Sequence, residues 1–359
     1  MTMQSPYRSV SKSRPPPSPL KVAVLMGGVS REREVSIASG NCVADALKQA
    51  GVNVVVADAK PDPSRLGVEP RQGELSVLED HSIDVFFIAL HGTFGEDGQI
   101  QNILESKGLT YTGSPPQASK LAFDKWASKE YLTKAGVPIP DAILFEPKPT
   151  ILKNINIEDI LWRIGQKYVI KPLREGSTIG ISIADNAKQA VADAAKCAAE
   201  FGDCMIEEFV PGRELTVSVL GKEALPILEI RAPGGFYDYH AKYINDSTEY
   251  LFDTIDSPVL VAKIQKMAID CFNALGCRGA ARVDFILGND GRPYVLEINT
   301  IPGMTSHSLL PKAAAKAGIS MSQLCMKMVD MALADSHRDF KPQRTPPTTT
   351  IEGRQRTQR

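Results

Sequence analysis

Near the start of the chain, hydrophobic residues form short uninterrupted runs that are separated by stretches of helical propensity. Such runs are typical of strands buried on both faces, and strands that alternate with helices form parallel sheets. We therefore expect a small doubly wound parallel sheet that extends to about Gly113. The loops at 27–36 and 91–98 follow predicted strands, where such sheets bind ligands. The predicted strands are 21–26, 52–57 and 84–90.

A second unit follows a predicted helical stretch at 119–135. Its two apolar strands lie near 167–172 and 205–210, and a glycine-containing loop at 174–180 comes directly after the first. Between the loop and the second strand, the alanine-rich segment 186–201 has high helical propensity. This order predicts a second α/β unit with a loop at the end of one strand.

The third unit begins with alternating polar and apolar residues, which indicate strands with one buried face. Ser257-Pro258 combines a favoured N-cap residue with a proline at the first helical position, so a helix should begin there. Gly288-Asn-Asp-Gly291 predicts a hairpin connection. The predicted strands are 214–220, 225–230, 282–287 and 294–299, and helices at 309–317 and 321–332 follow them.

These three α/β units lie between two ends without periodicity. The first end is rich in proline and serine, and the last is rich in proline, threonine and arginine, so we expect both to be disordered. The predicted division is a leader at 1–19, domains at 20–118, 119–208 and 209–335, and a tail at 336–359.

Composition narrows the class of protein. Of 359 residues, 43% are hydrophobic and 23% are charged, and a net charge of −1 gives no general attraction to nucleic acid or an anionic membrane. No apolar run reaches the roughly 20 residues needed to cross a bilayer. The six cysteines include no Cys-x-x-Cys pair, which is typical of reduced thiols. We expect a cytoplasmic protein without nucleic-acid or membrane partners.

The predicted hairpin carries the residues best suited to chemistry. Asp284 and Glu297 lie on its paired strands, and Asn299 shares a sheet face with Glu297 because strand side chains alternate. These oxygens suit Mg²⁺ bound with phosphates, although solvated carboxylates on an edge hairpin would show the same pattern. Arg282 could stabilise phosphoryl charge on the same face. A helix that begins near Leu309 could bind an anion, and this combination favours a binding site.

Other segments could bind a nucleotide, but each has a plainer interpretation. Lys171 leads into the glycine-containing loop, which matches neither a Walker A motif nor Gly-x-Gly-x-x-Gly, and it could be a solvated strand end. Glu207 and Val210 could hold adenine between two units, with Glu214 at the ribose, or they could form an exposed acidic linker. His91 follows a buried strand and could be either structural or functional.

Five motifs, in this order, resemble those of the D-alanine–D-alanine ligases. The resemblance extends from about Leu20 to Ala334. The motifs are Gly27-Gly-Val-Ser-Arg-Glu-Arg-Glu-Val-Ser36, Leu90-His-Gly-Thr-Phe-Gly-Glu-Asp-Gly98, Lys171-Pro-Leu-Arg-Glu-Gly-Ser177, Phe236-Tyr-Asp-Tyr-His-Ala-Lys-Tyr243 and Glu297-Ile-Asn-Thr-Ile-Pro-Gly-Met-Thr-Ser-His-Ser308.

This resemblance implies an ATP-grasp fold, in which ATP lies between a central subdomain and a C-terminal, magnesium-binding domain. The N-terminal domain would then bind substrate. The cofactors implied are ATP and two Mg²⁺ (or Mn²⁺) ions. The residues implied at the ATP phosphates are Lys125, Lys171 and Lys242, those at adenine and ribose are Glu207, Val210 and Glu214, and the metal ligands are Asp284, Glu297 and Asn299, with Glu297 bridging both ions.

The resemblance also implies how two D-alanine molecules are held. Glu32 should bind the ammonium of the first, with His91 nearby. Ser308 and the Leu309 amide should bind the carboxylate of the second. The implied product is D-alanyl-D-alanine, formed through D-alanyl phosphate with release of ADP, and it supplies peptidoglycan precursor synthesis. A homodimer is implied as well.

Catalytic roles follow from the same resemblance. Arg282 and the Gly303 amide should form the oxyanion hole, where loss of one donor typically costs about 10²–10³ in rate. Ser177 and Tyr243 should link to Glu32 through hydrogen bonds and close the loop over the site. Tyr243 favours an amine nucleophile, because ligases that make D-alanyl-D-lactate generally lack this tyrosine. Many relatives have a small polar residue at the position of Leu173, next to the phosphate loop.

Three other functions would explain fewer of these sequence features. Another ATP-grasp carboxylate–amine ligase would share the metal ligands and lysines but would not need Glu32, Ser177 and Tyr243 together. A catalytically inactive nucleotide-binding sensor would be expected to lose metal ligands, and none is missing. A dinucleotide-dependent dehydrogenase is disfavoured because Gly27-Gly28 lacks the third glycine and the acidic residue about twenty positions later.

Overall fold

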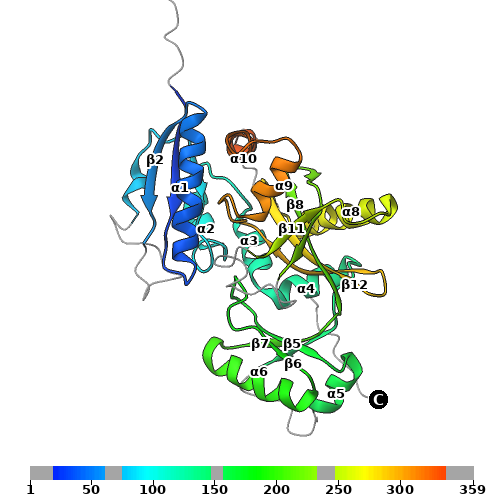
Figure 1. Ribbon diagram of the computed structural model, residues 1–359. Coiled ribbons are helices and arrows are strands. Elements are labelled where there is room, and N and C mark those ends of the chain that lie inside the picture. Colours follow the sequence, from blue (N-terminus) through cyan, green and yellow to red (C-terminus); the bar gives the residue numbers. More distant parts are fainter. Residues whose placement is uncertain (1–18, 61–74, 147–156, 233–246, 337–359) are drawn as a thin grey trace, which may run out of the picture.

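In the part of the chain that the structure describes, the strands form three sheets, which are flanked by helices (Figure 1). The computed structural model describes residues 19–60, 75–146, 157–232 and 247–336. The leader and tail lie outside these residues except for their innermost positions, and Lys242 and Tyr243 lie outside them entirely. The domain boundaries at 118/119 and 208/209 stay predictions.

The first sheet is parallel and comes from the start of the chain. It contains β1 (Lys21–Met26), β2 (Asn53–Asp58) and β3 (Val85–Ile88), in the order β2-β1-β3. One face packs against α1 (Arg33–Gln49) and α10 (Met321–Ser336), and the other against η2 (Ser76–Glu79) and α2 (Gln99–Ser106). Both faces are therefore buried, which explains the uninterrupted apolar runs and confirms the predicted parallel sheet.

The second sheet is antiparallel and covered by helices on one face. It has the order β4-β7-β5-β6 and consists of β4 (Ala142–Phe145), β5 (Tyr168–Pro172), β6 (Ser182–Ala184) and β7 (Cys204–Glu208). The covering helices are α5 (Ile157–Ile164) and α6 (Ala187–Phe201). Asn186 caps α6 through a 2.9 Å hydrogen bond from Gln189 N. The other face is turned toward the third sheet (Figure 1).

The third sheet is also antiparallel and contains the predicted hairpin. Its order is β11-β10-β8-β12-β13, and β9 pairs with β8. The strands are β8 (Gly212–Leu220), β9 (Glu223–Ala224), β10 (Leu228–Arg231), β11 (Glu249–Phe252), β12 (Ala280–Gly288) and β13 (Pro293–Asn299). α8 (Pro258–Ala274) packs against one face, and the Ser257 side chain caps it, as the Ser-Pro pair predicts.

The helical stretch predicted at 119–135 is two helices rather than one. α3 (Pro116–Phe123) ends at Asp124, whose backbone is extended, and α4 (Lys125–Lys134) begins immediately after it. The Asp124 carboxylate accepts a 3.0 Å hydrogen bond from Ala127 N, so this residue serves as an N-cap. Both helices pack into the core of the third sheet.

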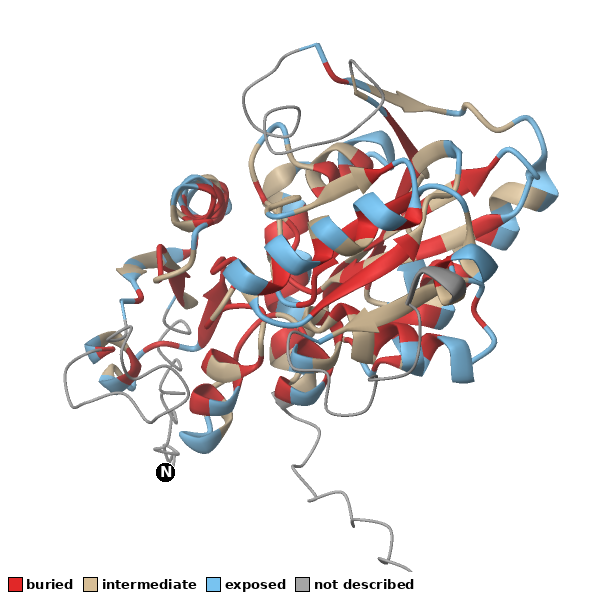
Figure 2. Cartoon of the chain, turned by 90° about the horizontal axis from the view of Figure 1, so that it is seen from below, coloured by how far each residue is buried: buried red, intermediate tan, exposed pale blue. Residues whose placement is uncertain are grey.

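The end of the chain joins the third sheet to the first. α9 (Leu309–Lys316) and α10 contribute Leu310 and Val329 to the same core as α1 and β1. Figure 1 shows α10 beside α1 and α9, and Figure 2 shows buried residues along the strands with exposed residues on the outer helix surfaces. This packing brings the loops of the first sheet to the third.

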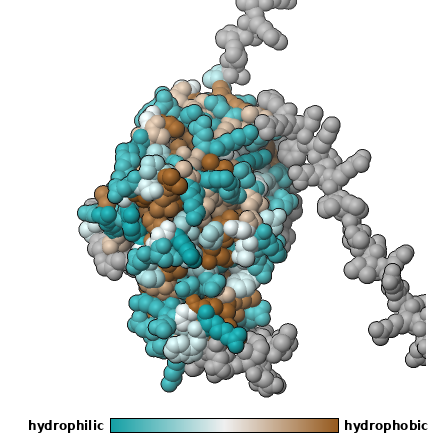
Figure 3. Space-filling model, turned by 90° about the vertical axis from the view of Figure 1, so that its right-hand side faces the viewer, coloured by the Kyte–Doolittle hydropathy of each residue, from teal (hydrophilic) through white to brown (hydrophobic). Residues whose placement is uncertain are grey.

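No helix among the described residues has both the length and the apolar character needed to cross a bilayer. On the face drawn in Figure 3, apolar residues form separate small patches between hydrophilic ones.

Candidate active site

Two adjoining cavities lie on the polar face of the third sheet. The larger, which we call the long cleft, lies between the second and third sheets and spans about 1520 Å³, part of it open to solvent. The smaller, the inner cavity, spans about 910 Å³, also partly open to solvent, and lies where loops of the first sheet reach the third. Arg282, Glu297 and Leu309 line both cavities, so a ligand in the long cleft can meet one in the inner cavity there.

Strand alternation creates this polar face. Val283 of β12 is fully buried in the core, so its neighbours Arg282 and Asp284 point to the opposite face. Pairing with β13 places Arg282 opposite Asn299 and Asp284 opposite Glu297. The structure therefore brings the three candidate metal ligands and the arginine together on one patch.

A β-bulge interrupts the alternation on β13. Pairing passes from Asp284–Glu297 to Phe285–Val295, which leaves Leu296 as the extra residue. Leu296 and Glu297 both line the long cleft, although a strict period of two would put them on opposite faces. The bulge thus sets an apolar side chain beside a carboxylate in the cleft.

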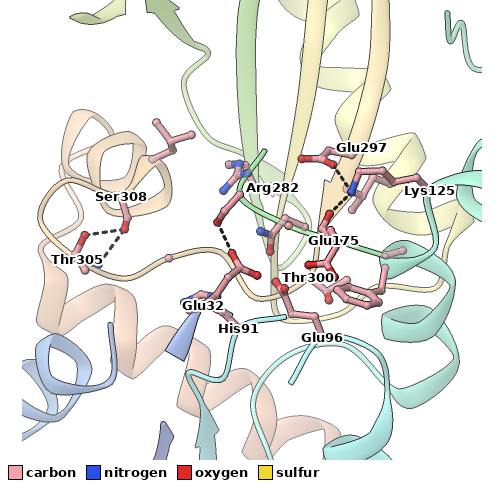
Figure 4. A pocket seen from close by; sticks show the side chains of 18 of the residues that line it. Glu32, His91, Glu96, Lys125, Glu175, Arg282, Glu297, Thr300, Thr305 and Ser308 are labelled. Atoms are coloured by element: carbon pink, nitrogen blue, oxygen red, sulfur yellow. Dashed lines mark hydrogen bonds and ion pairs between the residues drawn. The ribbon is translucent and has the colours of Figure 1, made fainter. Parts of the chain in front are cut away.

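Both carboxylates of this patch already have cationic partners. Arg282 Nε and Nη2 donate to Asp284 at 2.8 and 2.7 Å, and Thr216 Oγ1 donates to it at 2.6 Å. Lys125 Nζ lies 3.0 Å from Glu297 Oε2 (Figure 4). Burial alone would lower the pKa of Lys125, but Glu297 raises it above its ordinary value. This end of the long cleft therefore contains both positively and negatively charged side chains.

The donor set fits magnesium that is shared with a phosphate. Asp284, Glu297 and Asn299 offer hard oxygen ligands, and Asn299 Oδ1 accepts a 2.9 Å hydrogen bond from Ile301 N, which fixes its orientation. Within the described ranges, no three His, Cys, Asp or Glu side chains form a group that could hold a metal. Mg²⁺ usually takes one or two carboxylates and completes its shell with phosphate oxygens and water, so this patch suits it.

At the far end of the long cleft, Glu207 is buried between two lysines. Its exposed fraction is 1%, Lys171 Nζ donates to Oε1, and Lys129 Nζ lies 2.6 Å from Oε2. Burial would raise the pKa of Glu207, but Lys171 and Lys129 lower it below its ordinary value. Val210 and Glu214 also line the cleft. The alternative of an exposed acidic linker is therefore wrong for Glu207.

The glycine-containing loop after β5 is anchored to the start of α4. Lys125 N donates to the Leu173 carbonyl at 3.0 Å, and Lys125 Nζ donates to the Glu175 carbonyl at 2.7 Å (Figure 4). Arg174 Nε donates to Asp124 at 2.9 Å. Leu173 takes part through its backbone, so its apolar side chain does not disturb this anchor.

The same loop reaches the first sheet through Ser177. Ser177 and Thr178 have left-handed backbones, with φ of 51° and 65°, which is uncommon for residues other than glycine and is typical of functional sites. This turn directs Ser177 Oγ to donate a hydrogen bond to Glu32, which is 7% exposed. His91 lies in the same cavity (Figure 4), and burial lowers its pKa, which favours a neutral imidazole.

Glu96 is a cavity residue to which the sequence analysis assigns no role. It is 6% exposed, and its Oε2 accepts a 2.8 Å hydrogen bond from Gly92 N. Burial, and then the charge of Glu32, raise its pKa well above the ordinary value. Figure 4 shows it pointing into the same space as Glu32. Its place in the motif at 90–98 was the available indication in the sequence.

The loop after β13 completes the inner cavity on the side of α9. Ser308 Oγ accepts from Thr305 N at 3.1 Å and lies 2.9 Å from Thr305 Oγ1. A Cβ at Gly303 would lie 2.7 Å from Ser308 Oγ, so glycine allows this close approach. Ser308 does not cap α9 with its side chain, and the helix start, with the Leu309 amide, faces a cavity where a carboxylate is favoured.

Comparison with known proteins identifies the family that combines these features. The model of the D-ala D-ala ligase C-terminus matches residues 131–330, and that of the N-terminus matches 62–114. The chain belongs to the D-alanine–D-alanine ligase family. The D-alanine–D-alanine ligase of Nitrosospira multiformis is 41% identical over 312 residues, which cover 87% of this chain and 96% of the relative. That of Aromatoleum aromaticum is 42% identical over 313 residues, with 87% and 96% covered.

Solved structures of the ligase family have the same architecture. The D-alanine–D-alanine ligase of Bacillus anthracis has a TM-score of 0.74 and 34% identity and covers 89% of this chain and 99% of its own. The same ligase complexed with ATP also has a TM-score of 0.74, with 33% identity and the same coverage. The ligase of Coxiella burnetii has a TM-score of 0.72 and 25% identity, with 89% and 96% covered. The expected ATP-grasp architecture is confirmed, and the dehydrogenase alternative is wrong.

Membership of the ligase family leaves individual roles as predictions. Lys242 and Tyr243 lie outside the described residues, so their positions relative to Glu32 stay predictions. Lys129, like Glu96, is a buried residue of the site that the sequence analysis missed. It lies four residues after Lys125, a spacing that places both on one helix face.

Proposed function

We propose that this chain is an ADP-forming ligase that joins two D-alanine molecules to D-alanyl-D-alanine and thereby supplies peptidoglycan precursor synthesis. One observation carries the proposal: the long cleft and the inner cavity meet at Arg282 and Glu297. A nucleotide in the cleft would present its terminal phosphate where an amino acid held by Glu32 presents its carboxylate. The names of the relatives support the choice of D-alanine and of ATP.

ATP fits the long cleft with its base at the Glu207 end and its phosphates toward the end marked by Arg282 and Glu297. Adenine would bind between Val210 and Leu296, with its amino group toward Glu207, and the ribose would bind at Glu214. The phosphates would extend toward Lys125 and Lys171, with Lys242 as a third phosphate contact. Two Mg²⁺ (or Mn²⁺) ions held by Asp284, Glu297 and Asn299 would offset charge between the phosphates and the attacking carboxylate.

The first D-alanine fits the inner cavity beside the loops of the first sheet. Its ammonium would bind Glu32, whose carboxylate is fixed by Ser177, with His91 alongside. One oxygen of its carboxylate attacks the γ-phosphorus, and the bond from that phosphorus to the ADP oxygen breaks. D-Alanyl phosphate and ADP result. Lys125 lines the inner cavity and contacts Glu297, which lines both cavities, so it would stabilise the transferred phosphoryl group.

The second D-alanine completes the reaction from the side of α9. Ser308 and the Leu309 amide would bind its carboxylate, and its neutral amine attacks the acyl carbon. Arg282 and the Gly303 amide would stabilise the tetrahedral oxyanion. Phosphate then leaves with the oxygen that linked it to the acyl carbon. Tyr243 would join Ser177 and Glu32 in closing the site, which excludes water that would hydrolyse the acyl phosphate.

We further propose a cytoplasmic homodimer. The cysteine pattern supports the location. The family resemblance supports the dimer.

Product analysis tests the proposed function. Purified protein is incubated with ATP, Mg²⁺ and D-alanine, with L-alanine, or with D-alanine plus D-lactate, and ADP and product mass are measured. We expect D-alanyl-D-alanine with D-alanine, no product with L-alanine, and no depsipeptide with D-lactate. A different amide would support another ATP-grasp ligase, and ATP binding without any ADP release would support an inactive sensor.

A further inference from the structure

At the far end of the long cleft, the buried carboxylate of Glu207 contacts two lysines, Lys129 and Lys171. Only Lys171 has a role in the proposed binding of ATP. Glu207 has an exposed fraction of 1%, Lys129 of 3% and Lys171 of 8%. The carboxylate is shared, because Lys171 contacts Oε1 and Lys129 lies 2.6 Å from Oε2. Lys171 lines the long cleft, whereas Lys129 does not. The two lysines therefore hold the same carboxylate from the cleft side and from the protein interior.

The geometry of helix α4 explains why Lys129 contacts Glu207 although it does not line the long cleft. Lys125 and Lys129 are one turn apart, so they lie on the same helix face, about 6 Å apart along the axis. Lys125 contacts Glu297 at the phosphate end, and Lys129 contacts Glu207 at the adenine end. Lys129 Nζ also lies 3.4 Å from the carbonyl of Pro140, a residue that lines the cleft.

The proposed function requires Lys171 to change partners. In the structure Lys171 pairs with Glu207, but with ATP bound it is expected at the phosphates. A carboxylate buried this deeply would then lose a partner, and an uncompensated buried charge is strongly unfavourable. Lys129 does not line the cleft, so it remains beside Glu207 when Lys171 moves.

We propose that Lys129 is a positioning residue that keeps Glu207 ionised and oriented toward the adenine amino group while Lys171 moves to the phosphates. This inference rests on the proposed function, and it assigns Lys129 no contact with ATP. The role proposed for Lys129 affects which nucleotide base the protein selects as well as its affinity for ATP. A fixed carboxylate accepts a hydrogen bond from a 6-amino group but repels the 6-oxo group of hypoxanthine, so the group discriminates ATP from ITP.

Substitution of Lys129 tests this inference on the full chain. In Lys129→Met, Glu207 has only Lys171 as a partner and should retain it, so we expect the KM for ATP to rise about tenfold or more with a smaller change in kcat. The preference for ATP over ITP should fall as well. Lys129→Arg keeps the charge and should restore part of the ATP affinity. Lys134→Met, on the exposed end of the same helix, is the matched control and should leave both nucleotides unaffected.

A second background separates positioning from simple loss of folding. Glu207→Gln removes the buried charge, so adding Lys129→Met should raise the KM for ATP little further. Non-additivity of this kind, measured as a double-mutant cycle, supports the inference. The inference is overturned if Lys129→Met folds and retains wild-type KM and ATP-over-ITP preference, or if its effect is undiminished with Gln at 207. Failure of the wild-type protein to form D-alanyl-D-alanine would instead overturn the proposed function.

Discussion

A single methyl group added at Gly176, in the variant Gly176→Ala, should impair the use of D-alanine much more than the use of ATP. The backbone of Gly176 is outside the left-handed region, so alanine is conformationally allowed there. Its Cβ would lie 2.7 Å from Glu32 Oε2, about 0.7 Å closer than the 3.4 Å of ordinary contact. The carboxylate has little freedom to retreat, since Ser177 binds its other oxygen and Glu32 is only 7% exposed.

Gly176→Ala should therefore displace Glu32 from the ammonium of the first D-alanine. A misplacement approaching 1 Å can lower the rate by about 10²-fold, so we expect kcat/KM for D-alanine to fall by about 10–100-fold, with a much smaller change for ATP. Steady-state kinetics with each substrate varied in turn would measure both. Gly165→Ala is the control for the D-alanine kinetics, because its Cβ meets Glu208 Cγ at 3.3 Å, and neither Gly165 nor Glu208 lines the inner cavity. Unchanged D-alanine kinetics, or equal losses in both variants, would refute this reasoning.

Three further variants test other parts of the site. Glu297→Gln should abolish dipeptide formation without unfolding the protein, and activity near the wild-type level would contradict the metal assignment. Glu96→Gln should reduce the pH dependence of the free energy of unfolding. In the folded protein Glu96 keeps its proton at pH values where the carboxyl of the unfolded chain, with an ordinary pKa of 4.5, has lost it. Stability therefore falls as pH rises above 4.5 toward the folded pKa, by at most about 1.4 kcal/mol per pH unit. Denaturant titrations at several pH values should show this slope reduced in the variant, and identical slopes would count against a buried neutral Glu96. Asp124→Ala removes the cap of α4 and should lower the free energy of unfolding by about 1 kcal/mol; no change in the denaturant midpoint would show that the cap is not needed.

Most strands could be predicted because burial left a clear pattern in the sequence. The run at 21–26 is buried on both faces, and the start of α8 follows directly from Ser257-Pro258. The neighbouring placement of Asp284 and Glu297 follows from hairpin pairing. These features are local, so the sequence alone was sufficient to predict them.

Features set by tertiary packing were not predictable from periodicity. The bulge that turns Leu296 into the cleft depends on how β13 pairs with β12. The break at Asp124 depends on a cap that also holds Arg174 of a distant loop. The burial of Lys129 beside Glu207 joins two segments that are far apart in the chain, and nothing in either segment alone indicates that both side chains are inside.

The proposed reaction begins with attack by the carboxylate of one D-alanine on the terminal phosphate, at the junction marked by Arg282 and Glu297. D-Alanine labelled with ¹⁸O in its carboxylate tests it most directly, with mass analysis of the phosphate released during turnover. The mechanism predicts that one ¹⁸O atom appears in phosphate for each dipeptide formed, because the oxygen that bridges carbon and phosphorus leaves with the phosphoryl group. Dipeptide formed with unlabelled phosphate would contradict the acyl-phosphate route.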